Sequence, residues 1–260
     1  MTGRRARVQS LSQPSPPNPN PLISNFYSLY AHEFLRVACC VPRTRVADAE
    51  FNLGQTLGLA AQGDKARTAI MVFPELGLSS YAIEDLLLQD ALLDEVERSV
   101  AQIVAASKSL FPVLVVGAPL RVSDRLYNTA IVIHRGKILG VVPKTFLPNY
   151  REFYEKRHFV SGANVIVNEI ELAGQVAPFG TDLLFGSDGS IDVTFHVEIC
   201  EDIWVPVPPS SHAALAGAEL LVNLSASNIT IGKAELRRLL CGSQSARASA
   251  AYAYSASGPG

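Results

Sequence analysis

Three polar residues that together could carry out acyl transfer each stand directly past an apolar run of the chain. Glu75 follows IMVFP, Lys144 follows ILGVVP and Cys200 follows FHVEI. A proline before Glu75 and before Lys144 ends its strand at a defined place, because proline has no backbone N–H to donate. In α/β sheets, active sites gather beyond the carboxyl ends of strands. A carboxylate, an ammonium group and a thiol presented there together indicate amide hydrolysis.

Each of the three groups has a role in amide hydrolysis through a thioester. A thiol with an ordinary pKa of about 8.5 needs a base to become a nucleophile at neutral pH. Glu75 would take the proton of Cys200, pass one to the leaving ammonia and then activate water. The ammonium group of Lys144 would stabilise the oxyanion of the tetrahedral intermediate. A helix beginning after Cys200 would place the thiolate near a favourable dipole end.

Taken singly, each residue also has a plainer interpretation. Glu75 reads as a solvated turn residue, Lys144 as a surface charge and Cys200 as a buried thiol. A metal site at His196 and Cys200 is not expected, because His196 lies inside a predicted strand and no other ligand cluster accompanies it. The other cysteines are predicted to be reduced thiols, mostly buried as small hydrophobes, in a cytoplasmic protein; they are Cys39, Cys40 and Cys241.

The elements that must position these residues alternate along the chain, short apolar strands with helices. This alternation predicts an α/β protein with buried strands, in one domain over residues 25–260. Arg135-Gly136, between two apolar runs, predicts a hairpin turn. The predicted strands are Leu35–Val41, Ala69–Phe73, Val113–Val116, Thr129–His134, Ile138–Val142, Asp192–Ile199 and Leu220–Leu224. The predicted helices are Asp48–Ala61, Leu86–Ser109, Ser211–Ala216 and Lys233–Ala250.

Composition excludes several classes of protein. The 260 residues carry a net charge of −2, with 48% hydrophobic and 18% charged residues. This balance offers no basic surface for nucleic acid, and no apolar run reaches the roughly 18 residues of a membrane span. Residues 1–24 are predicted to be a disordered tail rich in Pro, Ser and Asn. No apolar segment follows the early arginines, so the tail is not a secretory signal.

The triad residues and their flanks resemble the nitrilase (carbon–nitrogen hydrolase) superfamily, in which Glu, Lys and Cys occur in this chain order. The matching motifs here are FPEL around Glu75, PK at Lys144 and EICED around Cys200. Within that superfamily the chain is most similar to the N-terminal glutaminase domain of glutamine-dependent NAD+ synthetase. That closer similarity rests on the segments YAIEDLL, LYNTA, KTFLPNYREFYE and NLSAS, the last followed by IGK.

The resemblance implies a fold and a set of site residues. The fold would be a four-layer α-β-β-α sandwich, truncated at the C-terminus before its last strands. The triad would be Glu75 as general base, Lys144 as electrostatic stabiliser and Cys200 as nucleophile. Glu155 would orient the lysine and the substrate, and the backbone N–H of Glu201 would help to hold the oxyanion. The amino-acid end of glutamine would be bound by Tyr150, Ser227 and Lys233, the last standing where arginine is usual.

The resemblance also implies a function for the domain. The triad would hydrolyse glutamine and supply ammonia for ATP-dependent synthesis of NAD+ from deamido-NAD+. That synthesis needs a synthetase domain with a Ser-Gly-Gly-x-Asp-Ser loop, which these residues do not contain; it would act in cis or in trans. The glutaminase domain itself would need no cofactor, since ATP and Mg belong to the synthetase domain. The superfamily further implies a homo-oligomer.

Two other functions stay open at this point. The chain could be a free-standing amidase that acts on another small amide, which a preference for such an amide over glutamine would reveal. It could instead be a truncated, inactive interaction module, because missing C-terminal strands would leave an unpaired sheet edge open to partner pairing.

Overall fold

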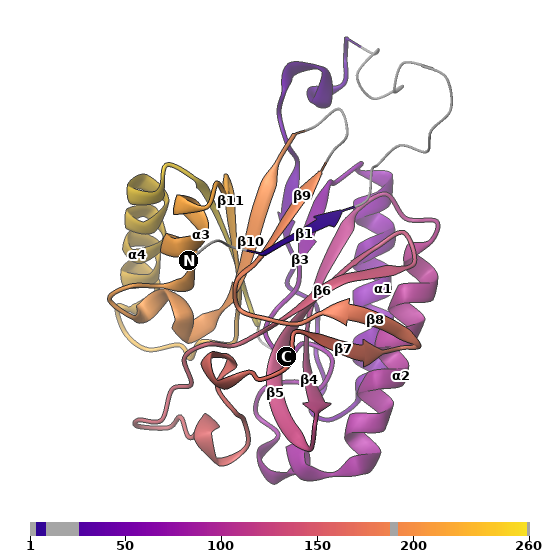
Figure 1. Ribbon diagram of the computed structural model, residues 1–260, viewed down its shortest axis with the longest axis vertical. Helices are drawn as coiled ribbons and strands as arrows, with labels where there is room; N and C mark the ends of the chain where they lie inside the picture. The colour runs from indigo at the N-terminus through magenta and orange to yellow at the C-terminus, as the bar shows by residue number, and fades with distance from the viewer. Residues whose placement is uncertain (1–3, 9–25, 188–191, 259–260) are drawn as a thin grey trace.

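The computed structural model describes residues 4–8, 26–187 and 192–258. Two five-stranded sheets face each other, and helices cover their outer faces (Figure 1). Helices α1 (Ala49–Lys65) and α2 (Asp90–Ser107) lie on one side, and α3 (Pro209–Leu215) and α4 (Lys233–Ala248) on the other. This arrangement is the predicted four-layer α-β-β-α sandwich.

The first sheet has the order β2-β3-β4-β5-β6. Strands β2, β3 and β4 are parallel, whereas β4, β5 and β6 form antiparallel hairpins. The predicted turn at Arg135-Gly136 joins β5 to β6, and both residues have positive φ, 50° and 78°, as a type I′ turn requires. The strand bounds are β2 (Val37–Cys39), β3 (Ile70–Val72), β4 (Val113–Val122), β5 (Arg125–His134) and β6 (Lys137–Pro143).

The second sheet has the order β1-β9-β10-β11-β12. Strands β10, β11 and β12 are parallel, so their carboxyl ends meet at one edge, while β9 runs antiparallel to β10. The bounds are β1 (Arg4–Val8), β9 (Leu183–Ser187), β10 (Thr194–Ile199), β11 (Leu220–Ser225) and β12 (Ala251–Ala256). A separate hairpin of β7 (Glu169–Leu172) and β8 (Gln175–Pro178) lies beside β6.

The N-terminal segment differs from the predicted disordered tail over residues 1–24. Arg4–Val8 forms strand β1, which runs parallel to β9 from Arg4 opposite Leu183 to Val8 opposite Ser187. The pairing gives β9 backbone partners on its outer side, which an edge strand otherwise lacks. Amino-acid composition carries no information about pairing with a strand that lies far along the chain, so the sequence did not predict β1. The proline-rich part of the predicted tail lies outside the described residues.

The predicted helices are present, with shifted ends. Asp48 caps α1 by accepting the backbone N–H of Phe51 at 2.9 Å, and the helix continues to Lys65 rather than to Ala61. Helix α2 begins at Asp90 rather than Leu86, because Glu84–Leu88 forms a separate 3₁₀ turn. None of the helices in the described ranges combines the length and apolar character that crossing a membrane requires.

Three apolar layers hold the four structural layers together. Between the sheets lie buried side chains such as Val72, Val132 and Val197. A second layer packs α1 and α2 against the first sheet, and a smaller third layer packs α3 against the second sheet. Strands that are covered on both faces have near-continuous apolar sequences rather than alternating ones. The apolar runs in this sequence therefore correspond to buried strands.

A buried histidine joins two strands of the second sheet. His196 of β10 is 2% exposed, and its Nδ1 lies 3.0 Å from the carbonyl oxygen of Leu183. That carbonyl only accepts, so Nδ1 carries the proton of the ring. Burial lowers the pKa of His196 to about 4, although the bond to Leu183 and the charge of Asp182 oppose the shift.

This histidine predicts a loss of stability in acid. An unfolded histidine has a pKa of about 6.5, so between that pH and about 4 the unfolded chain binds more protons than the folded one. The free energy of unfolding should therefore fall by about 3 kcal/mol from this group as the pH drops through that window. His196→Gln should remove this pH-dependent part of the free energy of unfolding. Urea unfolding at a series of pH values measures the difference. Parallel stability curves for the parent and the variant would contradict it.

Candidate active site

Strand direction brings the three predicted catalytic residues to one edge of the molecule. Glu75 follows β3, Lys144 follows β6 and Cys200 follows β10, each directly or within three residues. Strand β6 runs in the same direction as β3, because two antiparallel hairpins separate it from β4. The three residues are buried, with 1%, 1% and 6% of their surface exposed, respectively.

Two glycines let the loops of Glu75 and Lys144 lie close to neighbouring backbone. A Cβ on Gly117 of β4 would stand 2.4 Å from the carbonyl oxygen of Pro74. A Cβ on Gly162 would stand 2.7 Å from the carbonyl oxygen of Pro143 and 2.9 Å from that of Lys144. Since any other residue would clash with backbone there, glycine is required for both loops to take their places.

An ammonium group held between two carboxylates forms the centre of the site. Nζ of Lys144 lies 2.6 Å from Oε1 of Glu75 and 2.6 Å from Oε1 of Glu155. Burial by itself lowers the pKa of Lys144, but the charges of the two carboxylates overcome it and raise that pKa well above its usual value. Lys144 is therefore a permanent cation in this site.

Further donors fix the two carboxylates. Glu75 accepts the side-chain amide N–H of Asn128 on Oε1 at 2.7 Å and the backbone N–H of Ala226 on Oε2 at 2.8 Å. Glu155 accepts the hydroxyl of Tyr81 at 2.6 Å on the same oxygen that binds Lys144. Among the described residues, Oε2 of Glu155 has no hydrogen-bond partner. Burial raises the pKa of Glu155, and the charge of Lys144 opposes that shift.

The thiol of Cys200 is held in a strained and buried position. Its backbone has a positive φ of 45°, and its N–H donates to Oδ1 of Asn223 on β11 at 3.1 Å. Burial, followed by the charge of Glu75, raises the pKa of Cys200, whereas Lys144 and a hydrogen bond from Ser225 lower it. The resting group is thus a thiol that needs a base. The predicted help from a helix dipole is not found, since only the five-residue 3₁₀ helix Cys200–Trp204 follows.

A carboxylate absent from the predicted site ties the cysteine loop to the lysine loop. Asp202, 1% exposed, accepts the backbone N–H of Ile199 at 2.9 Å on Oδ2. Its Oδ1 accepts the N–H of Phe146 at 2.7 Å and that of Thr145 at 3.1 Å. The sequence signal was available, because an acidic residue three positions after a strand end often caps the turn that begins there.

The other unpredicted residues share a recognisable feature. They are polar residues in otherwise apolar strands, or aromatic hydroxyls that donate to buried polar groups, and such buried groups need specific partners. All but Tyr254 lie within a segment that carried the family resemblance. They are Tyr81, Asn128, Asn223, Ser225 and Tyr254.

The residues predicted to bind substrate gather around Phe153. The hydroxyl of Tyr150 donates to the carboxylate of Glu201 at 3.0 and 2.9 Å, and the rings of Tyr150 and Phe153 lie 5.9 Å apart. Nζ of Lys233 lies 5.7 Å from the centre of the Phe153 ring and donates to Asn228. Ser227 lies nearer the nucleophile, since its backbone N–H donates to Oγ of Ser225 at 3.2 Å.

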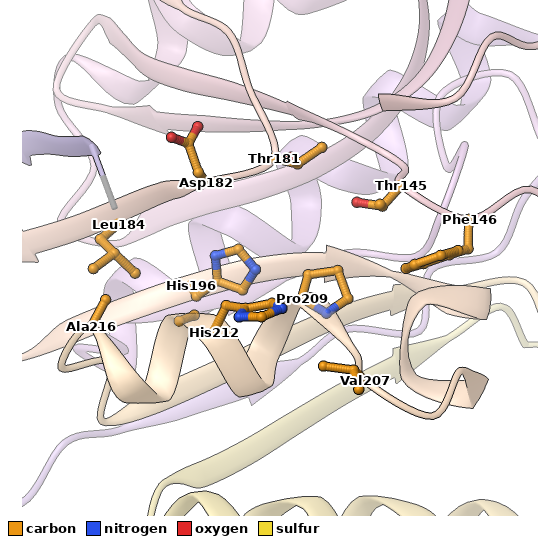
Figure 2. A pocket seen from close by; sticks show the side chains of 11 residues that line it. Thr145, Phe146, Thr181, Asp182, Leu184, His196, Val207, Pro209, His212 and Ala216 are labelled. Atoms are coloured by element: carbon orange, nitrogen blue, oxygen red, sulfur yellow. The ribbon is translucent and has the colours of Figure 1, made fainter. Parts of the chain in front are cut away.

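Two cavities lie near these loops. One of about 320 Å³ is lined by Tyr81, Phe153, Glu155 and Ala226, among others. A larger one of about 580 Å³ lies between α3 and the strands β9 and β10 (Figure 2), and Thr145 and Phe146, directly after Lys144, belong to its lining. Neither lining includes a triad residue. The smaller cavity is the candidate substrate site, because Glu155, which binds Lys144, and Ala226, which binds Glu75, both line it.

In the parts of the chain that the structure describes, no cluster of three or more His, Cys, Asp and Glu side chains is arranged to hold a metal ion.

Comparisons with known proteins agree with this geometry. Residues 36–258 match the family model described as carbon-nitrogen hydrolase. The chain is 55% identical over 236 residues to the glutamine-dependent NAD(+) synthetase of Mycobacterium tuberculosis (strain ATCC 25618 / H37Rv), covering 91% of this chain but only 35% of that protein. The chain thus spans about a third of the length of this curated relative.

Solved structures show the same fold. A glutamine-dependent NAD(+) synthetase from Cytophaga hutchinsonii superposes with a TM-score of 0.74 at 27% identity, over 85% of this chain and 36% of that one. An amidase of the nitrilase superfamily from Nesterenkonia superposes with a TM-score of 0.66 at 18% identity, over 86% of this chain and 77% of that one. The second likeness concerns the fold alone.

The link between the two loops predicts a loss of stability on Asp202→Asn. The amide would keep one accepting oxygen and turn an N–H₂ group toward backbone donors, leaving buried N–H groups unpaired. The free energy of unfolding should fall by about 2–3 kcal/mol. Urea unfolding measures it, with the exposed turn substitution Asp124→Asn as the matched control. A change equal to that of the control would contradict the role of Asp202.

Proposed function

The chain belongs to the carbon–nitrogen hydrolase family, and from that premise we propose that it is a glutaminase with Cys200 as nucleophile. The proposal rests chiefly on one observation, the ammonium of Lys144 bound 2.6 Å from both Glu75 and Glu155 beside a buried thiol. A structural ion pair would not need a third ionisable group, whereas acyl transfer needs a base, a cation and a nucleophile together.

The first half of the reaction forms a thioester. Glu75 takes the proton of the Cys200 thiol, and the sulfur attacks the amide carbon of glutamine. An ammonium has three donors, and Lys144 uses two of them on carboxylates, so its third N–H is left for the oxyanion. Oε2 of Glu155, which has no hydrogen-bond partner among the described residues, would accept an N–H of the substrate amide. Glu75 then gives its proton to the nitrogen, and ammonia leaves.

The second half regenerates the enzyme. With ammonia gone, Glu75 again carries a free negative charge and takes a proton from a water that attacks the thioester carbon. Lys144 holds the second oxyanion as it held the first. The thiolate of Cys200 leaves and recovers a proton from Glu75, so the products are glutamate and ammonia.

The amino-acid end of glutamine is an ammonium next to a carboxylate, and residues that contact Phe153 and Tyr150 offer both opposite charges. Lys233 provides a cation for the carboxylate, and Glu201 provides an anion for the ammonium. Burial raises the pKa of Glu201, and the hydrogen bond from Tyr150, followed by the charges of Lys144 and Lys233, opposes that shift. A lysine in place of arginine keeps the charge but loses the two-pronged hydrogen bond to a carboxylate.

The ammonia would serve ATP-dependent synthesis of NAD+ from deamido-NAD+ on a synthetase domain, acting in cis or in trans. Support comes from the relatives named glutamine-dependent NAD(+) synthetase, of which this chain covers 35–36% of the length. ATP and Mg would belong to that domain. A cytoplasmic location and a homo-oligomer stay predictions. A free-standing amidase with another small substrate is the alternative, and its support is the fold shared with the Nesterenkonia amidase.

The nucleophile assignment predicts that Cys200→Ala stops glutamine hydrolysis. Loss of a covalent nucleophile should lower kcat by at least about a thousandfold, because Cys200 is the thiol next to the base and the cation of the site. Ammonia release from glutamine measures it, with Cys241→Ala on α4 as a matched cysteine control. Ammonia release at the parent rate by Cys200→Ala would contradict the assignment.

The charge of Lys233 predicts selectivity for glutamine over simple amides. Lys233→Ala should raise KM for glutamine about tenfold while leaving that for butanamide unchanged, since butanamide has no carboxylate. Lys233→Arg should retain the glutamine KM or lower it. A parent chain that prefers butanamide to glutamine would favour the free-standing amidase, and an equal rise for both amides would show that Lys233 does not bind the carboxylate.

A further inference from the structure

A hydroxyl buried beneath the nucleophile has a fixed direction. Ser225, at the end of β11, is fully buried, and its Oγ lies 3.2 Å from Sγ of Cys200. The backbone N–H of Ser227 donates to the same Oγ at 3.2 Å, and the phenol of Tyr254 donates to it as well. A hydroxyl has two lone pairs and one proton. With both lone pairs occupied, the only direction left for its proton is toward sulfur.

We propose that Ser225 is a catalytic residue that donates a hydrogen bond to the sulfur of Cys200, and that Tyr254 is a positioning residue that orients the hydroxyl for this purpose. The inference rests on the proposed function, because it takes Cys200 as the nucleophile. Tyr254 comes from β12, so this strand would reach the nucleophile through one intervening side chain.

The hydrogen bond acts most strongly when sulfur is charged. Bonds from a neutral donor to an ionised acceptor are roughly twice as strong as neutral ones. When the thiol proton moves to Glu75, the Ser225 proton stays on its own oxygen and its bond to sulfur strengthens. The same bond would stabilise the thiolate when it leaves the thioester in the second half-reaction. Ser225 thereby opposes burial and the charge of Glu75, which both disfavour the thiolate.

Tyr254 keeps the proton that it donates. Its phenol donates to Oγ of Ser225, and burial, followed by the charge of Cys200, raises the pKa of the phenol, so the proton stays on the phenolic oxygen. The phenol can therefore occupy one lone pair of Ser225 whether Cys200 is a thiol or a thiolate. Without it, the Ser225 hydroxyl could rotate and direct its proton elsewhere part of the time.

Alkylation of Cys200 tests the proposal without any use of the amidase reaction. The full 260-residue chain is treated with iodoacetamide across a pH series, and peptide mass spectrometry separates Cys200 from the three other cysteines. Ser225→Ala should raise the apparent pKa of the Cys200 thiol by about one to two units, which would slow its labelling about three- to tenfold below that pKa. Tyr254→Phe should shift the pH profile the same way by a smaller amount.

Matched controls remove a hydroxyl far from the site. Ser99→Ala deletes a buried hydroxyl that donates to Glu95 in α2, and Tyr30→Phe deletes a phenol that donates to Arg67. Both should label Cys200 at the parent rate, since neither residue is near it.

Several outcomes would overturn the proposal. One is a folded Ser225→Ala chain that labels Cys200 with the parent pH profile. If Ser225→Ala does not fold, an unchanged profile for Tyr254→Phe overturns it instead. A parent Cys200 that resists iodoacetamide at every pH would contradict it too. A shifted profile in a chain that does not hydrolyse glutamine would support Ser225 while contradicting the proposed substrate.

Discussion

A lysine ammonium buried between two carboxylates is the interaction on which the rest of this site depends. Isolated buried charges are costly, and removing one partner of such a group leaves an uncompensated charge. Here Glu75 and Glu155 share one cation, and donors from Asn128, Ala226 and Tyr81 take part of the remaining negative charge. The arrangement fixes the carboxylate of Glu75 in a site whose nucleophile is a thiol with a raised pKa, and such a thiol needs a general base.

The sandwich supplies the groups from both of its sheets. Glu75, Lys144 and Asn128 come from the first sheet or its loops, whereas Cys200, Asn223 and Ser225 come from the second. Neither sheet alone holds a complete site, so the apolar layer between them is also what sets the distance from base to nucleophile. Asp202 strengthens the connection between the two sheets, since its carboxylate accepts backbone N–H groups from both the lysine loop and the cysteine loop.

The three candidate catalytic positions could be predicted from local sequence because each follows an apolar strand, whereas Glu155 and the candidate substrate residues came from the family resemblance. The turn at Arg135-Gly136 and the α1 cap at Asp48 were predictable for the same reason, as both depend on neighbours in the chain. Contacts between residues that lie far apart in the sequence could not be predicted in this way. Ala226 lies 151 positions from the Glu75 that it binds, and strand β1 pairs with β9 across most of the chain. Local patterns carry no record of such pairings.

If Cys200 is the nucleophile, an acyl-enzyme forms on its sulfur during turnover. Acid quenching of the chain during glutamine turnover, followed by peptide mass spectrometry, tests it directly. The peptide containing Cys200 should gain the mass of glutamine less ammonia, and the adduct should disappear once glutamine is consumed. Sustained release of ammonia with no adduct on that peptide, or with an adduct on another cysteine, would contradict it.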